Sequence, residues 1–543
     1  MELDPRRCYQ AALTKDRRFD GRFFTGVTST GIYCRPICPV APPKFENTLY
    51  FACAAAAEAA GFRPCKRCRP ETAPGTPAWV GTSAVVARAL RLISEGALDD
   101  ADVEQLSARL GIGERQLRRL FAQHLGASPA DIARARRVHF ARALLDDTDL
   151  PITQVAHSAG FSSIRQFNYA MRATFGAPPT HLRNRRGRRG PAENGGAVVV
   201  RLSYRPPLAW DAILRFLALR ATPGVEAVAG DVYRRTIEVN GAPGVIEVLQ
   251  GIKEITPKAS HLLMRLHLPH CDNMIDVVER VRRMFDLGAD PLRIAEHLHK
   301  SLPLSPRLDR LPGLRVPGAW DGFELAVRAI LGQQVTVQGA TTLAGRLVQA
   351  FGTPVDVETP ELTHLFPRPE VLADANLSNI GLPRARAATI RALASAVARG
   401  DLELDASQGL DEAVACLCAI PGLGEWTAHY IAMRALGEPD AFPSSDLGLR
   451  RALGNGAGLL PATEVVRLAE AWRPWRAYAA MYLWLGSSPG GTVDLTNEPT
   501  APDRHARSLQ AGMPEGGRGA DSRLKIAGMT KGQASVTGSV SPS

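Results

Sequence analysis

One short segment, residues 420–428 with the sequence IPGLGEWTA, constrains the fold of this 543-residue chain more than any other. Its proline and two glycines, Gly422 and Gly424, predict a tight hairpin between two helices. Glycines let the backbone approach another molecule closely, and the N–H groups that begin the next helix can hold a phosphate. Asp446 follows soon after the hairpin. The pattern therefore predicts an acid beside a gripped nucleic-acid backbone, and chemistry on DNA rather than binding alone.

Positive charge is concentrated in the first third of the chain. Residues 1–190 contain 29 Lys and Arg against 17 Asp and Glu, a balance of +12, whereas the remainder contains 36 against 37, a balance of −1. Such a basic region is typical of proteins that bind nucleic acid. No apolar stretch approaches the ~18 residues of a membrane span, and the N-terminus has no secretion-signal pattern. We therefore expect a cytoplasmic, nucleoid-associated protein without a membrane partner.

Four of the nine cysteines form two closely spaced pairs. Cys34 and Cys38 make a C-x3-C pair, and Cys65 and Cys68 make a C-x2-C pair. In a chain without a secretion signal this spacing favours zinc over disulfides. Four thiolates suit one tetrahedral zinc ion, which can hold together a domain too small for a good core. On spacing alone, such a site is more often structural than reactive.

The sequence around these cysteines resembles the N-terminal domain of the Ada family, whose members sense DNA methylation damage. The resemblance covers about residues 5–72 and rests on the segments CYQAA, DGRF, TGIYCRP and AGFRPCKRC. It implies that the zinc-bound thiolate of Cys34 takes a methyl group from a DNA phosphotriester. Methylation would turn one charged ligand into a neutral thioether, which lowers the repulsion between the site and DNA phosphates. The resemblance therefore implies a methylation-dependent gain in DNA affinity.

After a linker at residues 73–82, a helical block contains two copies of one pattern, at residues 103–121 and 152–167. In each copy a short amphipathic helix ends at glycine, and a second helix carries polar and basic residues. This predicts a tandem helix-turn-helix, with a generic helical bundle as the alternative. The block resembles the AraC-type DNA-binding region, with a connecting helix at about residues 130–145. The residues expected to face the DNA grooves are Arg115, Gln116, Arg119, Ser163, Arg165 and Gln166.

From residue 198 the pattern changes to alternating apolar strands. They are expected at residues 198–204, 225–228, 233–239, 244–249 and 264–268, with a helix at residues 210–219. Helices then dominate from residue 274 to about residue 486. Together with the hairpin and the segment FELAVRAILGQQV at residues 323–335, these features resemble the AlkA family of 3-methyladenine DNA glycosylases, in the helix-hairpin-helix superfamily. The resemblance covers roughly residues 197–487.

The AlkA resemblance implies a role for each matching residue. Asp446 matches the acid that stabilises an oxocarbenium-like sugar and orients water while the N-glycosidic bond breaks. The target base must leave the duplex, and Gln334 matches the wedge that fills its place. Alkylated purines are cationic and suit electron-rich aromatic faces. Trp426 and Tyr430 share one helical face, and Trp484 matches a third wall around the base.

Trp426 also limits the reaction. Related enzymes that cut the DNA backbone carry a Lys at this place, which forms a Schiff base, whereas Trp cannot. We therefore expect a monofunctional glycosylase without β-lyase activity. The hairpin carbonyls could also bind a monovalent cation. Without the resemblance, core packing would explain the tryptophans, and an N-cap before residues 447–453 would explain Asp446.

The sequence thus predicts a multidomain, mainly α protein. The expected parts are a small zinc α+β domain at residues 1–75, a tandem helix-turn-helix at 83–185, a linker at 186–196, a small antiparallel-sheet α+β subdomain at 197–300, an all-α helix-hairpin-helix glycosylase domain at 301–488 and a disordered tail at 489–543. The P-C-H-R-V segment of O6-alkylguanine transferases is absent from the sequence, as is the four-cysteine iron–sulfur pattern of some relatives.

We therefore expect a fused sensor, regulator and repair enzyme for alkylated DNA. Its expected partners are double-stranded DNA, alkylated DNA and RNA polymerase, and its expected state is a monomer. The alternative is a methylation-responsive transcription factor whose glycosylase half has decayed. An intact Asp446, Trp426 and hairpin favour the first hypothesis.

Overall fold

The structure is a computed structural model that describes residues 3–74, 83–99, 101–184, 197–251, 260–269, 271–454 and 458–485. Most of the two expected linkers and the whole of the expected disordered tail lie outside the described residues. Within those ranges, no helix combines the length and the apolar character that a bilayer span requires.

The N-terminal part is a small α+β fold, as predicted. Its four strands form a sheet in the order β3-β1-β2-β4, in which only the β2–β4 pair is parallel. Two small clusters of buried apolar residues lie within this part, one around Phe23 and one around Tyr33. A core this small gives limited stability, which agrees with the expected need for a metal ion. The elements are α1 (Pro5–Leu13), β1 (Phe24–Val27), β2 (Ile32–Cys34), β3 (Thr48–Phe51), α2 (Ala54–Ala59) and β4 (Arg63–Pro64).

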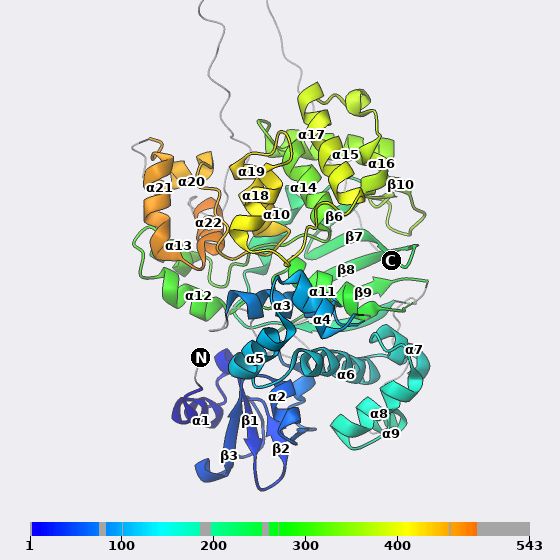
Figure 1. The fold of residues 1–543 in the computed structure, drawn as a ribbon, viewed down its shortest axis with the longest axis vertical. Coiled ribbons are helices and arrows are strands. Elements are labelled where there is room, and N and C mark those ends of the chain that lie inside the picture. Colours follow the sequence, from blue (N-terminus) through cyan, green and yellow to red (C-terminus); the bar gives the residue numbers. More distant parts are fainter. Residues whose placement is uncertain are drawn as a thin grey trace, which may run out of the picture. The chain divides into compact units, whose positions relative to one another are not determined.

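The next part contains the two predicted helix-turn-helix pairs, α4–α5 and α7–α8, which α6 connects (Figure 1). Local sequence signals set their ends. Asp102 and Gln105 form a capping box at the start of α4, and α5 and α8 end at Gly126 and Gly176, which both have positive φ. The elements are α3 (Ala84–Ser94), α4 (Val103–Arg109), α5 (Glu114–Leu125), α6 (Pro129–Asp147), α7 (Ile152–Ser158), α8 (Ile164–Phe175) and α9 (Pro179–Asn184).

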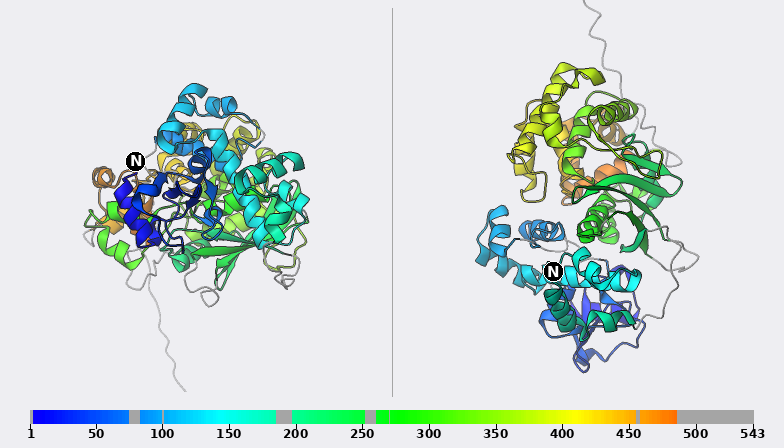
Figure 2. Two further views of the ribbon diagram at one scale, coloured as in Figure 1. Left: turned by 90° about the horizontal axis from the view of Figure 1, so that it is seen from below. Right: turned by 90° about the vertical axis from the view of Figure 1, so that its right-hand side faces the viewer.

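The predicted small sheet is a five-stranded antiparallel sheet in the order β5-β9-β8-β7-β6 (Figure 2). β9 begins before the expected residue 264, because its pairing with β5 continues to the pair Ser203 and His261. The apolar face of the sheet includes three fully buried side chains, those of Tyr233, Ile246 and Met264. The elements are β5 (Val198–Ser203), α10 (Trp210–Ala218), β6 (Glu226–Ala229), β7 (Val232–Val239), β8 (Ala242–Gln250) and β9 (His261–His267).

Helices make up most of the remainder, as predicted. Ile330, Ile390 and Ile431 belong to one apolar core, whereas Leu449 and Met481 belong to a second. The hairpin falls between α18 and α19, so it sits on helices of the first core. The elements are α11 (Met274–Met284), α12 (Pro291–Leu298), α13 (Ser305–Arg310), α14 (Gly322–Leu331), α15 (Val337–Phe351), β10 (Thr353–Pro354), β11 (His364–Leu365), α16 (Pro369–Ala373), α17 (Arg384–Ala398), α18 (Leu410–Cys418), α19 (Glu425–Arg434), α20 (Leu447–Leu453), α21 (Ala462–Ala469) and α22 (Arg476–Leu485).

Candidate functional sites

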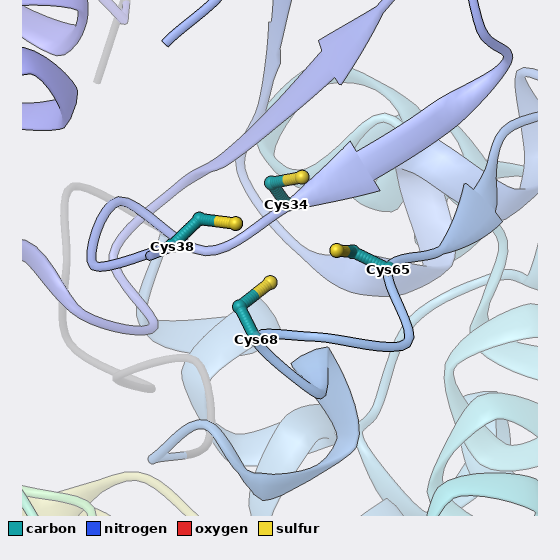
Figure 3. Close-up of side chains that lie close together, drawn as sticks. All are labelled: Cys34, Cys38, Cys65 and Cys68. Atoms are coloured by element: carbon teal, nitrogen blue, oxygen red, sulfur yellow. The ribbon is translucent and has the colours of Figure 1, made fainter. Parts of the chain in front are cut away.

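The four predicted cysteine ligands converge on one point. Their sulfur atoms all lie within 4.8 Å of one another and point into the same space (Figure 3). A tetrahedral Zn–S site with bonds of about 2.3 Å places its sulfurs about 3.8 Å apart, so the arrangement fits one zinc ion. Cys34 ends β2 and, like Cys38, is half-buried, whereas Cys65 and Cys68 are buried. Cys34 is therefore one of the two more exposed residues of the cluster.

Arg35 links the two cysteine pairs. Its backbone N–H donates to Cys68 Sγ over 3.3 Å, and its guanidinium donates to the Cys68 carbonyl oxygen over 3.2 Å and to Thr72 Oγ1 over 2.7 Å. The same guanidinium donates to Asp20 over 2.8 Å. Hydrogen bonds to metal-ligating sulfur orient and tune the ligand. Sequence reasoning did not assign this role, although Arg35 directly follows Cys34.

Asp446 is held by groups from two other helices. Its Oδ2 accepts a hydrogen bond from Trp426 Nε1 of α19 over 3.0 Å, and its Oδ1 accepts one from Trp484 Nε1 of α22 over 2.9 Å. Asp446 is also the N-cap of α20, because Oδ1 accepts from the Leu449 backbone N–H over 2.9 Å. The N-cap alternative from the sequence is thus correct, and it coexists with the two indole contacts. These hydrogen bonds fix the position of the carboxylate, and the residue remains partly exposed.

Trp426, Tyr430 and Trp484 form an aromatic cluster around this acid. Trp426 and Tyr430 stack with ring centroids 5.4 Å apart and planes 7° apart, as their spacing on α19 predicts. Tyr430 and Trp484 lie 6.4 Å apart at 53°. All three rings are half-buried, unlike the core residue Trp472. Part of each of the three residues is therefore left uncovered by the protein.

Two guanidinium groups face the hydroxyl of Tyr430. Arg434 Nη1 donates to it over 2.8 Å, and Arg220 also lies against it. Burial by itself would raise the pKa of Tyr430, but Arg434 and Arg220 outweigh burial and lower that pKa from 10.0 to about 8.

The two hairpin glycines have different surroundings. Gly422 has a φ of +90°, and a Cβ built there would lie 2.0 Å from Thr389 Oγ1 of α17. Gly424 is the N-cap of α19, has a φ of −96°, and a Cβ there would meet no atom within 4 Å. No side chain caps α19, so the N–H groups of its first turn stay available. The fold itself requires Gly422, whereas the space at Gly424 is open toward solvent.

The loop between α14 and α15 is tied to the hairpin. Gln333 Nε2 donates to the Gly422 carbonyl oxygen over 3.2 Å and to Thr427 Oγ1 over 3.1 Å, and Arg386 of α17 donates to the Gln333 carbonyl oxygen. The next residue, Gln334, is exposed and has a φ of +57°. Sequence reasoning selected Gln334 but missed Gln333, which holds the loop against the hairpin.

The predicted groove-facing residues all lie on the outer faces of their helices. Arg115, Gln116 and Arg119 are exposed on α5, and Arg165 and Gln166 are exposed on α8 after the exposed Ser163. Tyr169 of α8, at 76% exposure, lies on the same face and was not predicted. It corresponds to Arg119, because the Arg-Gln pair recurs 50 residues later along the chain.

Profiles of four known families match the chain. They are the metal binding domain of Ada at residues 7–71, a helix-turn-helix domain at 106–185, the AlkA N-terminal domain at 199–321 and the HhH-GPD superfamily base excision DNA repair protein at 327–477.

Curated relatives include a Mycobacterium tuberculosis protein described as a probable bifunctional transcriptional activator/DNA repair enzyme AlkA. It is 44% identical over 487 residues, which cover 89% of this chain and 97% of that protein. The Escherichia coli DNA-3-methyladenine glycosylase 2 is 34% identical over 290 residues, which cover 52% of this chain and 95% of that protein. Among solved structures, a 3-methyladenine DNA glycosylase from Archaeoglobus fulgidus is 24% identical, with a TM-score of 0.45, and the match covers 52% of this chain and 97% of that one.

Proposed function

The chain belongs to the family of AlkA bifunctional transcriptional activators and DNA repair enzymes, and on this premise we propose which residues act in each half. The protein is a DNA glycosylase that removes alkylated bases such as 3-methyladenine, fused to a DNA-binding regulatory half. Asp446 is the catalytic acid of the glycosylase, and Cys34 is the methyl acceptor of the regulator.

The glycosylase proposal depends most on the two indole hydrogen bonds to Asp446. Indole N–H groups from two helices hold both oxygens of this carboxylate, beside three half-buried aromatic rings. A cationic base that leaves the duplex would stack on these rings. As the bond from the sugar to the base breaks, its electron pair leaves with the base, and Asp446 stabilises the positive charge on the sugar.

Water completes the reaction. Asp446 orients a water molecule, whose oxygen forms the new bond to the sugar carbon while its proton passes to the carboxylate or to solvent. Trp426 occupies the hairpin position where a Lys would form a Schiff base, and an indole has no amine for that step. The product is a free base and an intact abasic strand, so the proposed enzyme is monofunctional.

DNA is gripped at the hairpin. The uncapped N–H groups of α19 and the open space at Gly424 suit a DNA phosphate, and Gln334 projects from the adjoining loop as the wedge. A monovalent cation at the hairpin carbonyls is a separate proposal. Because the Gly422 carbonyl oxygen already accepts from Gln333, such an ion would bind beside that hydrogen bond or replace it.

The regulatory half uses the four-cysteine site. A zinc ion bound there would keep the thiols deprotonated. The Cys34 sulfur attacks the methyl carbon of a DNA phosphotriester, so that an S–C bond forms, the O–C bond breaks, and the phosphate oxygen leaves as a diester anion. Loss of one thiolate charge then strengthens binding by the exposed faces of α5 and α8. RNA polymerase is the proposed partner for activation, and a monomer the proposed state.

The glycosylase is tested by base release from methylated DNA. Purified protein should release alkylated bases, and Asp446→Asn should not, although its side-chain oxygen can still cap α20. Binding to DNA with an abasic-site analogue is the control for a folded variant. Equal release by both proteins would remove Asp446 from the reaction, and no release by the wild type would favour the regulator with a decayed glycosylase.

The regulator is tested by mass spectrometry after incubation with methylated DNA. One added methyl group should appear on Cys34 and none on Cys38, the other half-buried ligand. Zinc-loaded protein without an adduct on Cys34 would leave the four cysteines with a structural role only.

A further inference from the structure

Two arginines, Arg434 and Arg220, lie beside the aromatic cluster. Arg434, at 5% exposure, donates to the Pro317 carbonyl oxygen over 2.7 Å, to the Gly318 carbonyl oxygen over 3.2 Å and to the Tyr430 hydroxyl. Arg220 donates to the Phe216 carbonyl oxygen over 3.3 Å and faces the same hydroxyl. Within the described residues, neither guanidinium forms an ion pair with Asp or Glu.

Neighbouring arginines differ in this respect. Arg328 of α14 donates to Glu226 over 2.7 Å, and Arg235 of β7 donates to Glu324 over 2.8 Å. These ion pairs compensate their own charges. The uncompensated charges of Arg434 and Arg220 converge on one group that can become an anion, the Tyr430 phenol. Buried cations without a counter-ion are costly, so this geometry favours the phenolate.

We propose that Arg434 and Arg220 hold Tyr430 partly as a phenolate, and that this anion makes the aromatic cluster selective for cationic alkylated bases over neutral ones. The proposal rests on the proposed glycosylase function. Without the phenolate, the two guanidinium charges would oppose the entry of a cationic base. With it, the Tyr430 ring that stacks on Trp426 becomes electron-rich and carries the opposite charge.

The charged groups around Tyr430 come from several elements. Arg434 belongs to α19 itself, Arg220 follows α10, and the paired Arg328 belongs to α14. Asp446 accepts a hydrogen bond from the indole N–H of Trp426, the ring that stacks on Tyr430. Arg328 is paired with Glu226, so the lowered pKa of Tyr430, at about 8, agrees with the approach of Arg434 and Arg220 to its hydroxyl.

Ultraviolet difference titration of the full-length chain tests the ionisation directly. We expect one of the nine tyrosines to ionise near pH 8 in the wild type and this component to vanish in Tyr430→Phe. Arg220→Gln should move it to higher pH. Tyr478→Phe is the matched control and should leave it unchanged, because Tyr478 donates to Asp286 and has a raised pKa. Identical titrations of the wild type and Tyr430→Phe below pH 9 would overturn the proposal.

Selectivity is tested with two lesions in one duplex sequence, cationic 7-methylguanine and neutral hypoxanthine. The ratio of their kcat/KM values should rise as the pH passes through about 8, because the phenolate fraction rises there. Tyr430→Phe should abolish this rise and lower the ratio about tenfold. If Tyr430→Phe lowered kcat/KM equally on both lesions, Tyr430 would act only as an uncharged ring. That result would overturn the proposed selectivity.

The two proposals fail in distinguishable ways. Asp446→Asn should stop excision of both lesions but leave the tyrosine titration unchanged. If the wild-type protein excises neither lesion, both the glycosylase assignment and the proposed selectivity are wrong. The titration still decides, independently, whether Tyr430 ionises.

Discussion

Cys34 and Asp446, the proposed reactive groups of the two halves, are held by opposite means. Cys34 belongs to a small fold in which four sulfurs within 4.8 Å of one another need an ion between them. Asp446 is held by neutral N–H donors from α19, α20 and α22, which large apolar cores keep in place. The first site therefore depends on an added ion, and the second on the completeness of protein packing.

Zinc removal should produce the largest effect and should confine it to the first site. A structural four-thiolate site contributes roughly 10–16 kcal/mol, so chelation or Cys68→Ser should unfold the region around residues 7–71. Base release by the glycosylase half should persist. Limited proteolysis and an excision assay on the same sample measure both, and an unchanged digestion pattern would show that the first site does not depend on its ion.

Gly422→Ala should produce the next largest effect, in the second site. The new methyl group meets Thr389 Oγ1 at 2.0 Å and the residue keeps a φ of +90°, so we expect a loss of roughly 2–4 kcal/mol in unfolding free energy. Gly424→Ala is the matched control, because its Cβ meets nothing within 4 Å. The control should change stability by less than about 0.5 kcal/mol yet weaken binding to DNA. Equal melting temperatures for the two variants would contradict this difference.

Trp484→Phe removes one N–H donor from Asp446 and keeps most of the ring. A hydrogen bond to a charged group contributes about 1.5–3 kcal/mol, so kcat for base release should fall roughly 10–100-fold with little change in KM. Trp472→Phe is the control, because Trp472 Nε1 donates to Ser301 Oγ, away from Asp446. It should lower stability and leave kcat unchanged. A similar fall in kcat for both variants would mean that packing, not the hydrogen bond, matters.

Gly448→Ala should produce the smallest effect, with opposite signs for stability and rate. A Cβ there lies 3.0 Å from Asp446 Oδ1 and 3.3 Å from Trp484 Cδ1, so the carboxylate must shift by a few tenths of an ångström. We expect a roughly three- to tenfold loss in kcat. Replacing glycine within α20 should meanwhile raise the unfolding free energy by up to about 1 kcal/mol. Thermal melting and base-excision rates of the same variant test both effects. An unchanged kcat would show that the reaction tolerates a shifted Asp446 carboxylate.

Local patterns predicted much of the molecule from the sequence. The four cysteines, the duplicated helix pairs, the hairpin and the Trp426–Tyr430 face all depend on residues close together in the chain. Strand and helix ends differed from expectation by a few residues, as at β9, because pairing with another strand decides where hydrogen bonding stops.

Contacts across long sequence separations could not be predicted in this way. Gln333 and Gly422 are 89 residues apart, and Arg220 reaches Tyr430 from the end of α10. The Tyr430–Arg434 pair is the exception, because its i, i+4 spacing on α19 could have been read from the sequence. Gly448 gave no sequence signal either, because its missing side chain matters only once Asp446 and the distant Trp484 lie against it.

The double engagement of Asp446 has a consequence for how this half of the protein can change during evolution. The same carboxylate starts α20 and meets the two indoles, so a lineage that lost the chemistry would still be selected to keep an aspartate or asparagine there. Capping of α20 does not require Trp426 or Trp484. Retention of both indole N–H groups is therefore the better marker of an active descendant, and their replacement while Asp446 persists would mark a repair enzyme that had become a regulator alone.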